Sequence, residues 1–183
     1  MKKVVAHSFE SFYGKVKKIL ETARNSAYRA VNFAMVQAYW EIGRIIVEEE
    51  QKGVSRAQYG SSLLLSLSDR LTTDYGKGFD ESNLRNIRKF YLKHQKRDAL
   101  RPELSWTHYR ILMRVAEEPA REFYMQECVE GNWSTRQLER QINSLYFERI
   151  LLSGKNGQPI VKKEVDDKKE VSGLNISSKI LMF

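Results

Sequence analysis

The sequence predicts an all-α protein, a helical bundle that contains two helix-turn-helix-like or winged-helix-like units. Apolar residues recur every three or four positions through most of the first 150 residues, which is the period of a helix. Only 3 of the 183 residues are proline, and 42% are hydrophobic, so the chain can form a core of long, uninterrupted helices. Cap residues and glycine turns separate the periodic stretches, and they mark where we expect each helix to begin and end.

Two helices are expected before residue 53. The first runs over residues 9–23, with Ser8 as its N-cap. The second runs over residues 27–50 and ends before Gly53. Its apolar residues form one stripe: Ala27, Val31, Ala34, Ala38, Ile42 and Ile45. The small alanines predict a closely packed neighbouring helix, either within the domain or across a homodimer, and the pattern does not decide between these.

The first helix-turn-helix-like unit is expected over residues 58–96. A helix over residues 58–75 has Leu63, Leu64, Leu67 and Leu71 on its inner side, and glycines at 76 and 78 break it. Asp80 or Ser82 then caps a helix that runs to about Lys96. Its inner stripe is Leu84, Ile87 and Tyr91, and its outer side is basic.

Positive charge is concentrated around this second helix. Residues 76–114 hold 10 basic and 4 acidic residues, whereas residues 115–183 hold 10 and 11. Such a patch favours a polyanionic partner, with a merely solvated basic helix as the alternative. If the helix binds duplex DNA, one set of side chains reaches a groove and Lys93 and Lys96 contact phosphates. The set comprises Asn83, Arg85, Asn86 and Lys89, and Arg88 is a further DNA-contact candidate.

The second helix-turn-helix-like unit is expected over residues 119–151. Ser105 caps a short helix over residues 106–115, and Pro119 opens a helix that stops at Gly131 and Asn132. Ser134 and Gln137 have the spacing of a capping box, which opens a helix over residues 135–151. Leu138, Ile142 and Leu145 are expected to face inward, and Arg136 and Arg140 outward as further DNA-contact candidates.

Residue 152 is the expected end of the helical domain, since residues 153–183 are charged and aperiodic, as in a linker or a disordered tail. Asp166 and Asp167, followed by two lysines, superficially resemble a metal nuclease site, but no strand pattern flanks them to hold a metal ion.

No phosphate-binding loop and no metal-ligand spacing is present, so no cofactor is expected. Cys128 is expected to be a buried hydrophobe. No signal peptide is expected at the N-terminus and no apolar run reaches about 18 residues, so we expect the cytoplasm as the default location and no membrane partner.

Several stretches are similar to one known family. They are YWEIGR at 39–44, NLRNIRKFY at 83–91, LSWTHYR at 104–110 and NWSTRQLERQI at 132–142. Over about residues 10–150 the chain resembles the N-terminal domain of the YhcG-like family. In that family a helical domain precedes a PD-(D/E)XK nuclease domain, so the resemblance implies bacterial DNA processing or defence. The resemblance stops at about residue 153, and the nuclease carboxylates and lysine are missing, so we expect no cleavage by this chain.

Three functional hypotheses follow. The first is a DNA-binding accessory domain that uses the basic helix. The second is a dimerisation or protein-interaction module that positions a nuclease subunit without touching DNA. The third, an enzyme in its own right, lacks a recognisable site.

Overall fold

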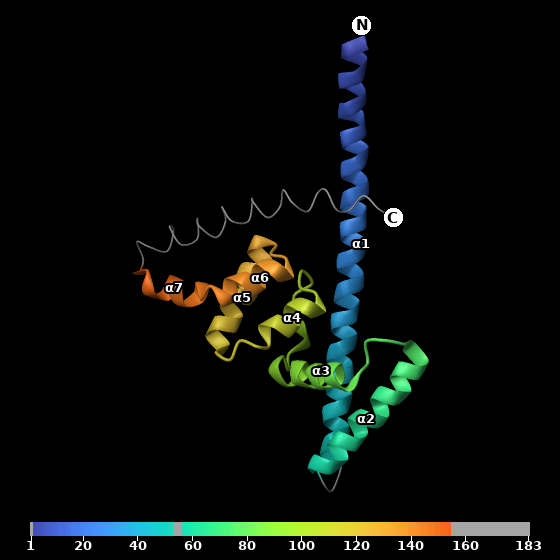
Figure 1. Ribbon diagram of the computed structural model, residues 1–183, viewed down its shortest axis with the longest axis vertical. Coiled ribbons are helices and arrows are strands. Elements are labelled where there is room, and N and C mark those ends of the chain that lie inside the picture. The colour runs from blue at the N-terminus through green and yellow to red at the C-terminus, as the bar shows by residue number, and fades with distance from the viewer. Residues whose placement is uncertain (1, 53–55, 155–183) are drawn as a thin grey trace. The chain divides into compact units, whose positions relative to one another are not determined.

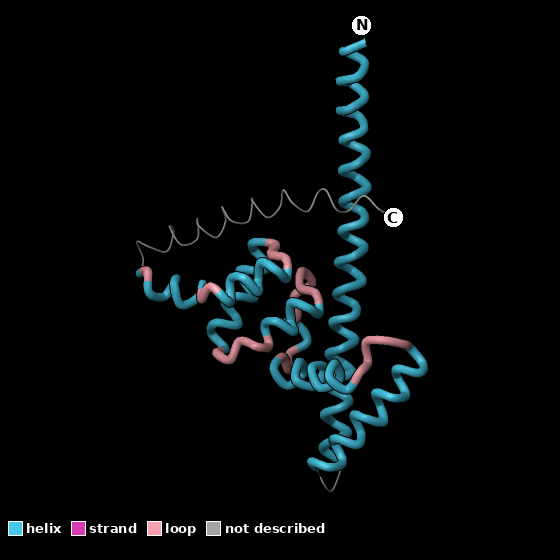
Figure 2. Tube along the Cα trace, viewed as in Figure 1, coloured by secondary structure: helices cyan, strands magenta, loops and turns pink. Residues whose placement is uncertain are grey.

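The computed structural model describes the backbone of residues 2–52 and 56–154, and the side chains of residues 9–52 and 62–154. These ranges contain seven α-helices, one 3-10 turn and no strand, which confirms the all-α class (Figure 2). The helix-turn-helix and winged-helix assignments stay predictions. The helices are α1 (Lys2–Lys52), α2 (Arg56–Tyr75), α3 (Glu81–Lys93), α4 (Trp106–Leu112), α5 (Glu118–Gly131), α6 (Thr135–Asn143) and α7 (Tyr146–Leu152), with the 3-10 turn η1 at Arg97–Ala99.

The helices form two compact units, residues 1–106 and 107–183. In the first unit, α2 and α3 pack on the C-terminal half of α1, and the N-terminal half of α1 extends past them (Figure 1). Ile46, Leu64, Leu84 and Ile87 form the centre of its core. The predicted inner side of α2 is confirmed, because Leu64 is buried and Leu63, Leu67 and Leu71 are half-buried. Most of the predicted tail, and with it Asp166 and Asp167, lies outside the described residues.

Gly43 sets how closely α1 and α3 approach. A Cβ atom at this position would lie 2.6 Å from the carbonyl oxygen of Ile87 and 2.8 Å from Cβ of Tyr91. Carbon atoms in contact are normally about 3.5–4.0 Å apart, so only glycine allows the two backbones to be this close. Local sequence patterns could not single out this glycine, because its neighbour on α3 is more than forty positions away.

The two helices expected before residue 53 are one helix, and that prediction was wrong. Ser8 lies inside α1 rather than at its start. The expected gap held Arg24, Asn25 and Ser26, with neither glycine nor proline. Asn and Ser in a helix cost only a few tenths of a kcal/mol each, whereas starting a new helix is costly. Continuing the helix through these residues is therefore favoured.

The stripe predicted on the second of those helices does not face the core. Val36, Trp40, Gly43 and Val47 are buried against the rest of the unit. At 100° per residue they lie on the opposite side of α1 from Ala27, Ala34 and Ala38, which are exposed. Ile45 is 56% exposed. Of the six predicted stripe residues only Ile42 packs against the core cluster, so no described side chain of this unit covers the alanines.

In the second unit, α5, α6 and α7 pack on one another. Tyr109, Tyr124, Leu138 and Tyr146 are among its fully buried side chains. The Ser134–Gln137 capping box is confirmed, with the backbone N–H of Ser134 donating to Gln137 Oε1 at 2.7 Å. Asn132 ends α5 in a left-handed conformation, as its place after Gly131 predicts.

The helix expected over residues 135–151 is broken in two, and Leu145 is exposed rather than inward. Leu145 has φ 52° and ψ 46°, a left-handed conformation that separates α6 from α7. Ser144 Oγ donates to the carbonyl oxygen of Gln141, a local bond that competes with the helix. Beyond the break, the backbone N–H of Phe147 donates to the hydroxyl of Tyr124 at 3.1 Å. This long-range bond replaces a helical one and stabilises the break.

Candidate nucleic-acid interface

Helix α3 presents the basic side that the sequence predicted. Asp80 is its N-cap, and the Asp80 carboxylate accepts from the backbone N–H of Asn83 at 3.0 Å. Leu84, Ile87 and Phe90 are completely buried, and Tyr91 is half-buried, so the inner side is centred on Phe90 more than on Tyr91. The helix ends at Lys93, three residues earlier than predicted.

The predicted contact residues of this unit divide by exposure. Arg85, Lys89 and Lys96 are exposed, and Asn83, Asn86, Arg88 and Lys93 are half-buried. Lys96 does not lie on the helix, but in extended backbone just before η1. Arg85, Lys89 and Lys93 are spaced four residues apart, which places them in one row along α3.

The arginines of this side are paired with carboxylates. Arg85 donates to Glu81 one turn earlier on α3, and Arg88 Nε lies 2.5 Å from Glu50 Oε2 on α1. The Glu50 side chain is only 14% exposed, so the second pair is partly shielded from water. Sequence patterning could have suggested the Arg85–Glu81 pair from its spacing, but not the pair between residues 50 and 88.

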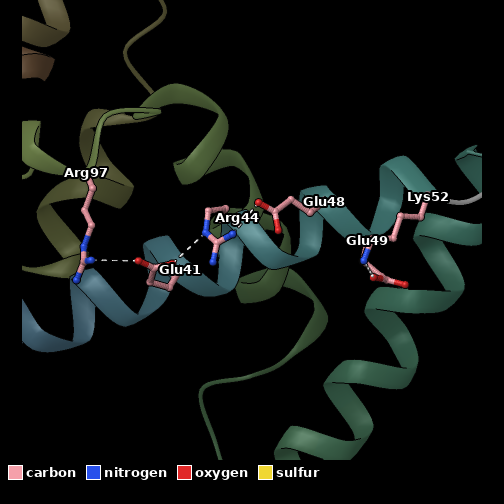
Figure 3. Close-up of polar contacts among 6 residues, drawn as sticks. All are labelled: Glu41, Arg44, Glu48, Glu49, Lys52 and Arg97. Carbon is pink, nitrogen blue, oxygen red and sulfur yellow. Dashed lines mark hydrogen bonds and ion pairs between the residues drawn. The ribbon is translucent and has the colours of Figure 1, made fainter.

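A further ion-pair network runs along α1 (Figure 3). Arg97 Nη1 lies 3.3 Å from Glu41, which also accepts from Arg44 Nε at 3.0 Å, and Arg44 Nη1 lies 2.7 Å from Glu48. The hydrogen bonds that Arg44 donates to Glu48 and Glu41 raise the pKa of Arg44, so it stays charged. Glutamates at the C-terminal end of α1 thus neutralise Arg88 and Arg97, two arginines of the basic segment, residues 76–114.

The lysines differ from the arginines. Within the described part of the chain, Lys77, Lys89 and Lys96 have no carboxylate within ion-pair distance. Their charges are therefore not offset by an ion pair with any described carboxylate. Exposed lysine ammonium groups act as point charges for phosphate, so these lysines are the strongest phosphate-contact candidates of the basic segment.

Asn83 has a structural role that the sequence did not reveal. Its Nδ2 donates to the carbonyl oxygen of Gly78 at 2.6 Å, and its Oδ1 accepts from Trp106 Nε1 at 3.1 Å. Trp106 in turn packs against Tyr39 and Phe90. Asn83 therefore links the start of α3 to the glycine turn and to Trp106, the last residue of the first unit. If Asn83 contacted a DNA base, these hydrogen bonds would have to break.

The second set of predicted contacts lies in the second unit. On α6, Arg136 is exposed and Arg140 is half-buried, so only Arg136 faces outward as fully as predicted. Helix α6 also carries Glu139, which lies between Arg136 and Arg140 in the sequence. Its carboxylate lies 3.4 Å from Arg114. Residues 107–183 hold 12 basic and 11 acidic residues, so no excess positive charge surrounds them.

His108 and Cys128, two side chains that can carry acid–base or nucleophilic chemistry in other proteins, are buried here. His108 Nε2 lies 2.9 Å from the carbonyl oxygen of Trp133, and burial lowers the His108 pKa. Burial also raises the pKa of the Cys128 thiol to about 12, which keeps it protonated and unreactive. Among the described residues no three His, Cys, Asp or Glu side chains gather as metal ligands. No described helix is long and apolar enough to cross a membrane.

Together these features define an all-helical domain with a basic helix and no recognisable catalytic site in the described residues. The chain belongs to the family of the DUF1016 N-terminal domain, whose model matches residues 15–149. It is similar to a protein of Escherichia coli K12 named "Putative nuclease YhcG", with 34% identity over 177 aligned residues. The alignment covers 79% of this chain and 47% of that protein, so the chain spans about half the length of its relative. No catalytic domain is detected in the chain, and no solved structure matches it.

Proposed function

We propose that this domain binds duplex DNA through the basic side of α3 and the segments on either side of it, from Lys77 to η1. The observation that carries the proposal is the set of uncompensated lysines, Lys77, Lys89 and Lys96, close together in the sequence around one capped helix. The first unit as a whole supports it, because residues 1–106 hold 19 basic and 12 acidic residues. A local positive excess attracts the phosphate backbone and releases its counterions.

Within this proposal the basic residues have different tasks. Lys89 and Lys96, with Lys93 in the same row as Lys89, contact phosphates. Arg85 remains 61% exposed beside Glu81, and an exposed ion pair is worth about 0–1 kcal/mol, so it can exchange its carboxylate for a phosphate or a base edge. Arg88 and Arg97 hold the segment against α1. In a longer relative such as YhcG, the domain would bring duplex DNA to a nuclease.

A comparison of charge-neutralised variants tests the proposal. Lys89→Gln with Lys96→Gln should weaken binding to a random-sequence duplex about 10-fold at roughly 0.1–0.2 M salt, because each lost phosphate contact removes counterion release. The matched control is Arg70→Gln with Arg114→Gln, which removes the same charge from exposed sites elsewhere. Equal weakening by the two pairs would show that only net charge matters and would contradict a site on α3.

Assembly is a second function that a separate observation favours. Every described side chain of α1 from Phe9 to Asn32 is exposed, although many of them are apolar. A monomeric protein rarely exposes a continuous apolar surface of this length. A protein-interaction role needs neither the lysines nor DNA, so the two functions can be tested independently.

A further inference from the structure

One continuous apolar surface, which we name the α1 stripe, runs along the side of α1 that faces away from the core. Its large residues are Phe9, Phe12, Tyr13, Val16, Ile19, Leu20, Val31 and Ile45. Its small residues are Ala23, Ala27, Ala34 and Ala38, all exposed. The residues opposite the stripe in the N-terminal half are polar, among them Lys18, Asn25 and Arg29. The N-terminal half of α1 is therefore amphipathic, with its apolar side uncovered.

We propose that the α1 stripe binds the same stripe of a second copy of this chain, with the two helices antiparallel. The proposal rests on the assembly function above and names its partner. Three observations carry it: the repeat of the stripe, the area it exposes, and the opposite distribution of size and charge along its two halves.

The repeat suits a long helical partner. From Phe9 to Ala23 the stripe follows a spacing of three and four residues, as in a heptad repeat. From Ala23 it follows an eleven-residue repeat through Ala34 to Ile45. An eleven-residue repeat stays close to the 3.6-residue turn of a straight helix, so the stripe keeps to one side of α1. At about 1.5 Å per residue, a partner helix could follow it for roughly 50 Å.

The exposed area is enough for a stable dimer. The eight large residues are between 37% and 68% exposed. Taking about 150–200 Å² for each when fully exposed, their accessible area is about 700–900 Å² on each copy. A standard protein–protein interface buries about 800 Å² on each partner. A pair of stripes therefore reaches the size of a specific interface.

Side-chain size favours the antiparallel orientation. The N-terminal part of the stripe carries Phe9, Phe12 and Leu20, whereas the C-terminal part carries Ala34 and Ala38. With Ala27 near the two-fold axis, opposite directions place Leu20 of one copy against Ala34 of the other and Val16 against Ala38, while Phe9 faces Ile45 at the ends. Cores pack best when large and small residues face each other in this way. A parallel pair would oppose aromatic to aromatic and alanine to alanine, and the helices could not keep one separation.

Charge favours the same orientation. Residues 2–29 of α1 hold 7 basic and 2 acidic residues, whereas residues 30–52 hold 2 basic and 4 acidic residues. Antiparallel helices bring the basic half of one copy beside a half of the other that has no excess of positive charge, since Glu41 and Glu50 there already pair with Arg97 and Arg88. Parallel helices would place the two basic halves together, and repulsion between flanking charges disfavours that arrangement.

Light scattering on the full chain in the absence of DNA tests the association. The wild type should have twice the 21.4 kDa chain mass. Ile19→Glu with Ala27→Glu should be monomeric, whereas Thr22→Glu with Asn25→Glu, on the exposed opposite side, should remain dimeric. A monomeric wild type, as expected if residues 155–183 of the same chain covered the stripe, would overturn the proposal. A stripe variant that is as dimeric as the wild type would overturn it too.

Disulfide cross-linking tests the orientation. A mixture of Phe9→Cys and Ile45→Cys chains should form a mixed disulfide under mild oxidation, and Phe9→Cys alone should not cross-link to itself. A disulfide between two copies of Phe9→Cys would show a parallel pair and overturn the antiparallel assignment. Cys128 is buried, so it does not interfere. The Lys89→Gln, Lys96→Gln variant should keep the dimer mass, which separates failure of this proposal from failure of DNA binding.

Discussion

Gly43→Ala is expected to destabilise the first unit because it inserts a methyl group between two helix backbones. The new Cβ would lie 2.6 Å from the carbonyl oxygen of Ile87, so α1 and α3 must separate by nearly 1 Å to restore normal contact. That separation loosens the packing around Leu84 and Ile87. Overpacking of this kind costs about 1–3 kcal/mol, and better helix propensity returns about 1 kcal/mol. The expected net loss is about 0–2 kcal/mol.

Gly14→Ala is the matched control in the same helix. Nothing lies within 4 Å of a Cβ atom at Gly14, so only helix propensity changes and the variant should gain about 0.5–1 kcal/mol. Urea denaturation followed by circular dichroism, at one fixed protein concentration, measures both free energies of unfolding. The close approach of α1 and α3 would be refuted if Gly43→Ala were as stable as Gly14→Ala.

Three further predictions concern side chains with structural roles. Asn83→Ala should lower stability by about 1–3 kcal/mol, because it leaves Trp106 Nε1 and the Gly78 carbonyl without this partner; an unchanged urea midpoint would contradict that role. Burial lowers the pKa of His108, so the unfolded chain takes up a proton first as the pH falls below about 6.5, and stability should decrease there. His108→Gln should reduce that decrease, and a wild type whose stability rises on acidification would contradict the assignment. The Cys128 thiol, with a pKa of about 12, should resist alkylation at pH 8 until the chain is unfolded in urea; rapid labelling of the folded chain would show that it is accessible.

Local signals in the sequence predicted most helix ends correctly. The Asp80 cap, the Ser134–Gln137 box and the stop at Asn132 depend on residues within a few positions of one another, and all are confirmed. The break at Leu145 depends on the hydroxyl of Tyr124, and the close packing at Gly43 depends on α3. Contacts between such distant residues cannot be inferred from periodicity alone.

The side of α1 that enters the core illustrates the same limit. Both sides of residues 34–47 are apolar, since Val36, Trp40 and Val47 oppose Ala38 and Ile45. Periodicity identified one side, and the fold buries the other. The same limit applies to the candidate site. Composition showed the net charge of α3. It could not show that Glu50 and Glu41, both on α1, pair with Arg88 and Arg97.

The salt dependence of duplex binding tests the central claim most directly, that lysines around α3 contact phosphates. If about four phosphates are contacted, affinity should fall roughly 100–200-fold between 50 and 200 mM salt, and a log–log plot should have a slope near −3.6. Removing Lys89 and Lys96 should bring the slope to about −1.8, whereas the Arg70→Gln, Arg114→Gln control should leave it unchanged. A wild-type chain whose binding does not depend on salt, or which does not bind at 50 mM, would contradict the account.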